Sequence, residues 1–185
     1  MSKIVGIDYS MTCPAICILG DSFRTSGIHF LTPNKKLQAA HMNMYGHIHR
    51  DYKTTEERFF NITNWAMVCL PPNLEENKTI VYIEDYSMGS TGPTFSIAEN
   101  TGLLKHYLYK NNVEFHLISP SVIKKDFTGK GNADKSLMYD AFVERTKIDL
   151  FQDLHLIRKT KVDSPISDIV DSYALALLGR KMYNG

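Results

Sequence analysis

The sequence lacks any apolar run near the roughly 20 residues that a membrane-spanning helix requires. Its first residues, MSKIVGIDYS, enter an expected strand at once, without the apolar stretch and small-residue cleavage site of a secretion signal. The apolar fraction is 43% and the charged fraction 22%, and both values are ordinary for a soluble globular protein. We therefore expect a protein that acts in the cytoplasm and does not enter a membrane.

Cysteine is scarce, with three residues in the chain. Cys13, Cys17 and Cys69 are odd in number and lack metal-ligand spacing, and Cys17 lies inside an apolar run. This pattern favours buried free thiols over a disulfide or a zinc site. His41 and the HIH stretch at 47–49 raise the question of a transition-metal site, but they lack partner cysteines or acids at ligand spacing. They are more typical of surface histidines.

The chain also lacks a charge excess, because 21 Lys and Arg residues balance 20 Asp and Glu residues and leave a formal net charge of +1. This balance excludes neither nucleic acid nor acidic small molecules as partners. Any affinity for DNA must therefore come from local clusters of basic residues. Such residues gather in the second half of the chain, at Lys105, Lys110, Lys124, Lys125, Lys130, Lys135, Arg158, Lys159 and Lys161.

Within this basic region the stretch TGKGNADKS, residues 128–136, is the best candidate for contact with a phosphate. Its glycines let backbone N–H groups approach a phosphate, and the helix expected after it offers a positive end. It is not a Walker P-loop, because Asp134 rather than glycine precedes Lys135. Most lysines in such a region are simply solvated, so contact with DNA is an expectation for Lys130 and Lys135 first, and then for Lys124 and Lys125.

The expected elements are three strands, a helix, a strand, a helix, a strand and then further helices. The opening strands, 3–8, 14–20 and 23–32, are separated by turn-forming residues and favour an antiparallel start. Further helices and strands follow at 56–70, 79–85, 94–110, 113–119, 120–127, 134–146 and 164–179. This order predicts an α/β fold with a mixed five-stranded sheet flanked by helices. At 185 residues the chain is about one domain, 1–185, and we interpret the polar segment at about 33–56 as an insertion with partial helix.

Four acidic residues stand where apolar strands or a buried helix are not expected to carry them. Asp8 follows IVGI and Glu84 follows IVYI, whereas Asp168 and Asp171 lie three positions apart on one face of the last helix. Any one of them could be a turn or capping residue. If the two strands are neighbours, however, the four acids converge and cannot all stay ionised without a cation. Oxygen-only ligands favour Mg²⁺ or Mn²⁺, and two such ions would suit the attack of water on a phosphodiester.

Four motifs, IVGIDYS, VYIEDYS, GKGNADKSLMYDAF and SDIVDSYALAL, occur in the order and approximate spacing of RuvC-type Holliday-junction resolvases. The sequence resembles this family of crossover junction endodeoxyribonucleases, within the ribonuclease-H-like superfamily, over most of its length except about 33–56. The resemblance implies that Asp8, Glu84, Asp168 and Asp171 are the catalytic acids that bind metal, and that Lys135 lies near the scissile phosphate. It also implies a Mg²⁺-dependent homodimer, with Mn²⁺ as a substitute, that cuts four-way DNA junctions in recombination and repair.

The loop after the second strand acid departs from the family, which usually carries there an aromatic residue that works at the junction centre. Tyr86 and Phe95 are the candidates for that contact with DNA in this chain. Some virus-encoded relatives accept a wider range of branched DNA, and a viral member would act in the host cytoplasm.

Two other functions remain open. ATP-binding proteins of the actin and sugar-kinase type also have a first strand that ends in GID, but they need two such domains. The fold could also serve a protein that binds branched DNA without cutting it, although the presence of all four acids argues against this. A magnesium-dependent cleavage assay on branched DNA separates the three functions.

Overall fold

The computed structural model describes residues 2–85, 94–158 and 161–185. Its strands are β1 Lys3–Asp8, β2 Ala15–Ile18, β3 Gly27–Thr32, β4 Ala40–His41, β5 Met44–Ile48, β6 Thr79–Glu84 and β7 Glu114–Ile118. Its α-helices are α1 Thr55–Cys69, α2 Thr94–Lys110, α3 Pro120–Thr128, α4 Lys135–Thr146, α5 Leu150–Asp153 and α6 Ile166–Asn184. Two 3-10 turns are η1 Phe23–Thr25 and η2 Lys35–Leu37. Each strand and helix expected from the sequence has an observed counterpart, although several boundaries shift.

A mixed sheet crosses the molecule in the order β4-β5-β3-β2-β1-β6-β7. Strands β1, β2 and β3 pair antiparallel, whereas β1 with β6, β6 with β7 and β3 with β5 pair parallel. The expected α/β class with a mixed sheet is confirmed. The sheet formed by the described residues has seven strands, however, which is two more than the five expected.

The two additional strands come from the polar segment 33–56. Strand β5 pairs parallel with β3, and the two-residue β4 pairs antiparallel with β5. Met44 and Gly46 of β5 are buried, and a Cβ atom at Gly46 would overlap the backbone of Leu37. Because only these two positions of β5 are buried, the segment carries little apolar alternation, and its strand signal is weak. Before α1 begins at Thr55, its helical content is limited to the 3-10 turn η2.

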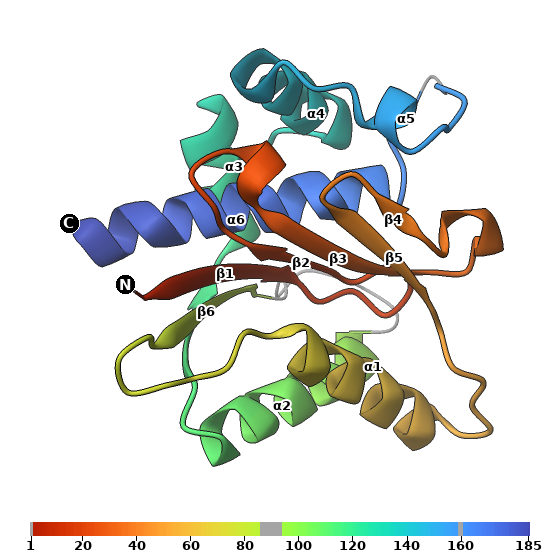
Figure 1. Ribbon diagram of the computed structural model, residues 1–185, viewed down its shortest axis with the longest axis vertical. Coiled ribbons are helices and arrows are strands. Elements are labelled where there is room, and N and C mark those ends of the chain that lie inside the picture. Colours follow the sequence, from red (N-terminus) through yellow and green to blue (C-terminus); the bar gives the residue numbers. More distant parts are fainter. Residues whose placement is uncertain (1, 86–93, 159–160) are drawn as a thin grey trace.

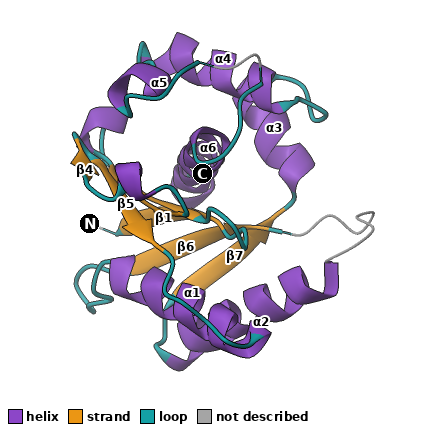
Figure 2. Ribbon diagram, turned by 90° about the vertical axis from the view of Figure 1, so that its right-hand side faces the viewer, coloured by secondary structure: helices purple, strands orange, loops and turns teal. Residues whose placement is uncertain are grey.

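Helices cover both faces of the sheet (Figure 1). Helices α1 and α2 lie on one face, and α6 lies on the other with α3 and α4 beyond it (Figure 2). Alternate residues of β1 and β6 divide between the two layers, with Ile4, Ile80 and Tyr82 in the core under α6 and Val5, Ile7, Val81 and Ile83 in the core over α1 and α2. By the same alternation Asp8 and Glu84 belong to the α6 face. Among the described residues, no helix is long and apolar enough to cross a bilayer.

Helix α6 approaches the centre of the sheet because glycines leave room for it. A Cβ atom at Gly6 of β1 would overlap the carbonyl oxygen of Ser172, and one at Gly179 of α6 would overlap the ring of Tyr82 on β6. Since α3 and α4 cover its outer side, α6 is buried on nearly all sides over its first four turns. The helix begins at Ile166, two residues later than expected.

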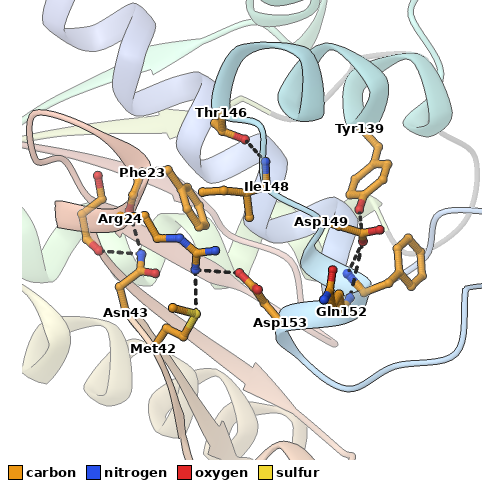
Figure 3. A network of polar contacts seen from close by, with 12 residues as sticks. Phe23, Arg24, Met42, Asn43, Tyr139, Thr146, Ile148, Asp149, Gln152 and Asp153 are labelled. Carbon is orange, nitrogen blue, oxygen red and sulfur yellow. Dashed lines mark hydrogen bonds and ion pairs between the residues drawn. The ribbon is translucent and has the colours of Figure 1, made fainter.

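A polar network fastens the segment after α4 to the far edge of the sheet (Figure 3). Arg24 of η1 forms an ion pair with Asp153 of α5 at 2.6 Å and donates a hydrogen bond to Sδ of Met42, beside β4. Asp149, directly before α5, accepts a hydrogen bond of 2.8 Å from the hydroxyl of Tyr139 on α4. Helix α5 is therefore held between α4 and the β4 end of the sheet.

Candidate metal centre

Two of the four predicted acids leave the sheet side by side. Strands β1 and β6 are parallel neighbours, with Ile7 paired to Ile83. The next residue in each strand, Asp8 in β1 and Glu84 in β6, therefore stands at the carboxyl end of the sheet and on its α6 face. The apolar residues before each acid are buried, which holds the two strand ends in place.

The other two acids come from the first two turns of α6. Asp171 completes a group with Asp8 and Glu84 in which a carboxyl oxygen from each lies within 4.8 Å of the others. Asp168 lies one turn earlier and is 6% exposed. It is not part of this tight group, but its charge raises the pKa of each of the other three carboxyl groups. The structure thus brings all four acids together.

Burial is the main cause of a raised pKa at all four carboxyl groups. The pKa of Glu84 rises to about 7, through burial and then through the charge of Asp171. The pKa of Asp171 rises to about 6, through burial and then through the charge of Asp168. Asp8 has a pKa well above its ordinary value, because burial and the charges of the other three acids all oppose its ionisation. Near neutral pH the group therefore favours either bound protons or a bound cation.

Two lysines bring positive charge to the acids. Nζ of Lys135, at the start of α4, donates to Oγ of Ser167 at 3.2 Å, and that hydroxyl donates to Oδ2 of Asp168 at 3.3 Å. The charge of Lys135 opposes the rise in pKa at three of the four acids. Lys124 of α3 opposes it at Glu84. The predicted Lys135 thus lies beside the acids, and Lys124, expected only to contact DNA, also acts on them.

The remaining residues predicted to contact DNA lie at the surface or outside the described residues. Lys125 on α3 and Lys130, in the turn between α3 and α4, are exposed. Phe95, in the first turn of α2, is 85% exposed. Tyr86 falls outside the described residues, so the structure places only one of the two aromatic candidates.

Sequence reasoning missed three residues that contact or adjoin the acids. Ser167 links Lys135 to Asp168, and its signal in the sequence is its position directly before that aspartate. Ser164 forms hydrogen bonds that lower the pKa of both Asp168 and Cys13. Burial, with the nearby charge of Asp168, raises the pKa of Cys13 to about 11. No local pattern indicates Cys13, because the loop after β1 brings it to the start of α6.

The donor set fits a hard divalent cation. Protein oxygens bind such ions at about 2.0–2.6 Å, so oxygens on opposite sides of one ion lie roughly 4–5 Å apart. The 4.8 Å limit on the separations among Asp8, Glu84 and Asp171 meets that requirement. Carboxylate ligands without sulfur or imidazole select Mg²⁺ or Mn²⁺ over softer metals. A bound cation would also relieve the repulsion that raises the pKa of these groups.

No protein-family model matches the chain, and no curated protein matches it in sequence. Solved structures do match. RuvC from Thermus thermophilus gives a TM-score of 0.56 at 13% identity, over 98% of this chain and 96% of that one. The same protein in complex with Holliday junction substrate also gives a TM-score of 0.56, at 12% identity over 100% of this chain and 97% of that one.

Two further structures give similar values. The yeast mitochondrial Holliday junction resolvase Ydc2 has a TM-score of 0.53 at 14% identity, over 95% of this chain and 77% of that one. Fowlpox virus resolvase, solved with its substrate Holliday junction DNA, has a TM-score of 0.51 at 17% identity, over 99% of both chains. The chain therefore adopts the ribonuclease-H-like fold of these resolvases, as its sequence motifs implied.

Proposed function

We propose that the protein is a divalent-metal-dependent endonuclease that hydrolyses phosphodiester bonds in branched DNA, and four-way junctions above all. The observation that carries this proposal is the convergence of Asp8, Glu84, Asp168 and Asp171 at the carboxyl end of two central strands. The fold adds support, since two of the similar structures are complexes with Holliday junction DNA. Resolution of recombination intermediates, repair, and removal of branched replication products would all use this activity.

The four acids would hold Mg²⁺, with Mn²⁺ as a substitute, and we propose two ions per site. When bound, such ions activate a water molecule for attack on the phosphodiester and stabilise the leaving oxygen. The acids themselves must be ionised to bind the ions, and Lys135 and Lys124 favour that state by opposing the rise in their pKa. The interior position of the acids limits access of bulk water and thereby strengthens their attraction for cations.

The basic residues on α3, in the turn after it and on α4 would bind the DNA backbone near the metal centre. Lys135 lies close enough to the acids to adjoin the scissile phosphate, whereas Lys125 and Lys130 are free to contact phosphates farther along. Helix α4 presents its positive end at the same place. Phe95, and Tyr86 outside the described residues, would supply the aromatic contact at the junction centre.

We further propose that the protein acts as a homodimer in the cytoplasm, or in the host cytoplasm if it is viral. A four-way junction presents symmetric pairs of strands, so two copies related by a two-fold axis would place one metal centre on each strand to be cut. Paired incisions of this kind leave ends that ligase can reseal. The molar mass in solution, with and without junction DNA, tests the dimer.

The experiment that tests the function is cleavage of an end-labelled four-way junction in Mg²⁺, in Mn²⁺ and in EDTA, beside a linear duplex of the same sequence. We expect cleavage that needs the metal and that prefers the junction. Asp8→Asn should abolish it, whereas Asp140→Asn, at an exposed aspartate of α4, should not. Binding of the junction without metal-dependent cleavage would overturn the nuclease and favour a non-cleaving binder. ATP turnover without cleavage would favour an actin-like or sugar-kinase-like domain.

A further inference from the structure

A second group of metal-ligating side chains lies on the opposite face of the sheet from the acids. His29 on β3, His47 on β5 and Cys69 at the end of α1 each offer a ligand atom, and these atoms all lie within 4.8 Å of one another. Strands β3 and β5 are parallel neighbours, with Leu31 paired to His47. His29 lies two residues before Leu31 on the same face, and Leu31 belongs to the core over α1. Three elements therefore bring the group together.

The separation of the two ring nitrogens suits a shared metal ion. Nδ1 of His29 lies 3.2 Å from Nε2 of His47. In a tetrahedral zinc site with Zn–N bonds of about 2.0–2.1 Å, two ligating nitrogens lie about 3.3 Å apart. Two imidazoles and a thiol offer nitrogen and sulfur, which suit Zn²⁺ and exclude Mg²⁺ as the preferred ion. This donor set differs in kind from the all-oxygen group at the other face.

The surroundings leave one coordination position open. His47, Trp65 and Cys69 line a cavity of about 350 Å³. Trp65 lies one helical turn before Cys69, and its buried Nε1 has no hydrogen-bond partner among the described residues. A water molecule on the metal would give this indole N–H an acceptor. Three protein ligands with water as the fourth is a common arrangement for zinc.

We propose that His29, His47 and Cys69 bind Zn²⁺, with water as the fourth ligand. The ion would link the end of α1 to β3 and β5, on the opposite face of the sheet from the candidate metal centre for DNA cleavage. Sequence reasoning favoured surface histidines and buried free thiols, because the three ligands stand far apart in the chain and form no spaced motif. This site does not depend on the proposed nuclease function.

Binding would release one proton per chain to solvent. The thiol of Cys69 gives its proton to solvent as the Zn–S bond forms. The hydrogen that lies between the facing nitrogens of His29 and His47 moves to the outer nitrogen of its own ring, so each neutral ring keeps one hydrogen, on the nitrogen directed away from the ion. The metal keeps its +2 oxidation state throughout, and no oxidant or reductant is needed.

The test is a titration of metal-free full-length protein with Zn²⁺ in competition with a chromophoric chelator, with Mg²⁺ in excess. We expect one Zn²⁺ per chain and a rise in melting temperature on binding. Cys69→Ser and His29→Gln should each weaken binding by at least about 10–100-fold, the loss typical for outer partners of a ligand. His49→Gln, at the other histidine of the HIH stretch, should change neither value. Co²⁺ in place of Zn²⁺ should give a thiolate-to-metal charge-transfer band that Cys69→Ser removes.

Several results would overturn the proposal. Zn²⁺ affinity that is unchanged in Cys69→Ser would place the ion elsewhere, as would a Co²⁺ complex without the thiolate band. Tighter binding of Co²⁺ than of Zn²⁺ would overturn the choice of metal. A melting curve of each metal-free variant controls for misfolding, and His29→Gln provides a second reading if Cys69→Ser does not fold. Cleavage activity plays no part in these measurements, so failure here is distinct from failure of the nuclease proposal.

Discussion

Gly6 of β1 lies directly against Ser172 of α6, so close that a Cβ atom at Gly6 would overlap the serine carbonyl oxygen. Asp8 lies two residues after Gly6, and Asp171 directly precedes Ser172. The same close approach that packs the helix on the strand therefore sets the separation between two of the acids.

Gly6→Ala should push α6 away from β1. Overpacking of this kind costs about 1–3 kcal/mol of unfolding free energy, and the shift should also reduce cleavage because Asp171 moves from Asp8. Chemical denaturation and a junction-cleavage assay measure the two effects. Gly102→Ala is the matched control, since a Cβ atom there meets no atom within 4 Å and alanine favours the interior of α2. A Gly6→Ala variant as stable as Gly102→Ala would contradict the packing argument.

Asp171→Asn keeps the shape of the side chain but removes the charge that a divalent cation needs. Cleavage should fall by at least about 100-fold, beyond the 10–100-fold typical for loss of an outer partner of a ligand. Junction affinity in EDTA should stay equal or rise, because one source of repulsion toward phosphate is gone. Asp168→Asn should have a smaller effect, since Asp168 lies outside the tight group of three acids. If Asp171→Asn cuts at the parental rate, or loses activity only because it unfolds, then Asp168 and Asp171 have a structural role and do not bind the metal.

The pH dependence of the unfolding free energy should reveal the acids with raised pKa values. Glu84 and Asp171 have pKa values of about 7 and about 6 in the folded protein, above their ordinary values of 4.5 and 3.8. The folded state therefore binds more protons than the unfolded state between about pH 4 and pH 7, and the acids destabilise it as the pH rises through that window. His29 acts with the opposite sign, because burial lowers its pKa to about 4.

A comparison of the stability of Asp171→Asn with that of the parent isolates the contribution of the acids. In EDTA, Asp171→Asn should gain stability over the parent as the pH rises from about 5 to 8, by on the order of 1–3 kcal/mol. Saturating Mg²⁺ should cancel this gain. The cation binds the intact group of acids and stabilises the parent, whereas the variant lacks the carboxylate of Asp171. Melting curves across pH, with and without Mg²⁺, measure both quantities. A gain that does not vary with pH would contradict the raised pKa values.

Lys135 and Lys130 should have separable effects. Lys135→Ala removes a charge that opposes the rise in pKa of Asp8, Asp168 and Asp171, so the acidic limb of the cleavage profile should move to higher pH. Lys130→Ala should leave that limb unchanged but reduce the slope of log affinity against log salt by about one, as expected for one lost phosphate contact. Lys110→Ala, at the far end of α2, is the control for both. If all three variants have the same pH profile and the same salt slope, Lys135 and Lys130 are ordinary solvated lysines without these roles.

The sequence could predict most of what places the acids, because that information is local. Buried runs before Asp8 and Glu84 mark central strands, and helical spacing marks the pair at Asp168 and Asp171. Parallel neighbours then bring the strand ends together without further information. The resemblance to a known family supplied what local patterns lack, namely which strands are adjacent.

The parts that the sequence could not predict depend on contacts between distant residues. Strand β5 has few apolar positions and is stabilised mainly by its backbone pairing with β3, which no window of sequence shows. His29, His47 and Cys69 likewise meet only because β3, β5 and α1 pack together. Ser167 was missed for another reason. Its role depends on a hydrogen bond from Lys135, which lies at the start of a different helix, α4.

Helix α6 supplies half of the acids and fills one face of the sheet, yet it is synthesised after both strands that carry the other two acids. While a ribosome is still synthesising the protein, strands β1 and β6 can form with only Asp8 and Glu84 at their ends, and the sheet face beneath the missing helix is bare. Domains fold as units during synthesis, so this one must wait for α6. A chain not yet synthesised through α6 would thus be aggregation-prone but unable to cut DNA, and the order of synthesis would itself delay the onset of cutting.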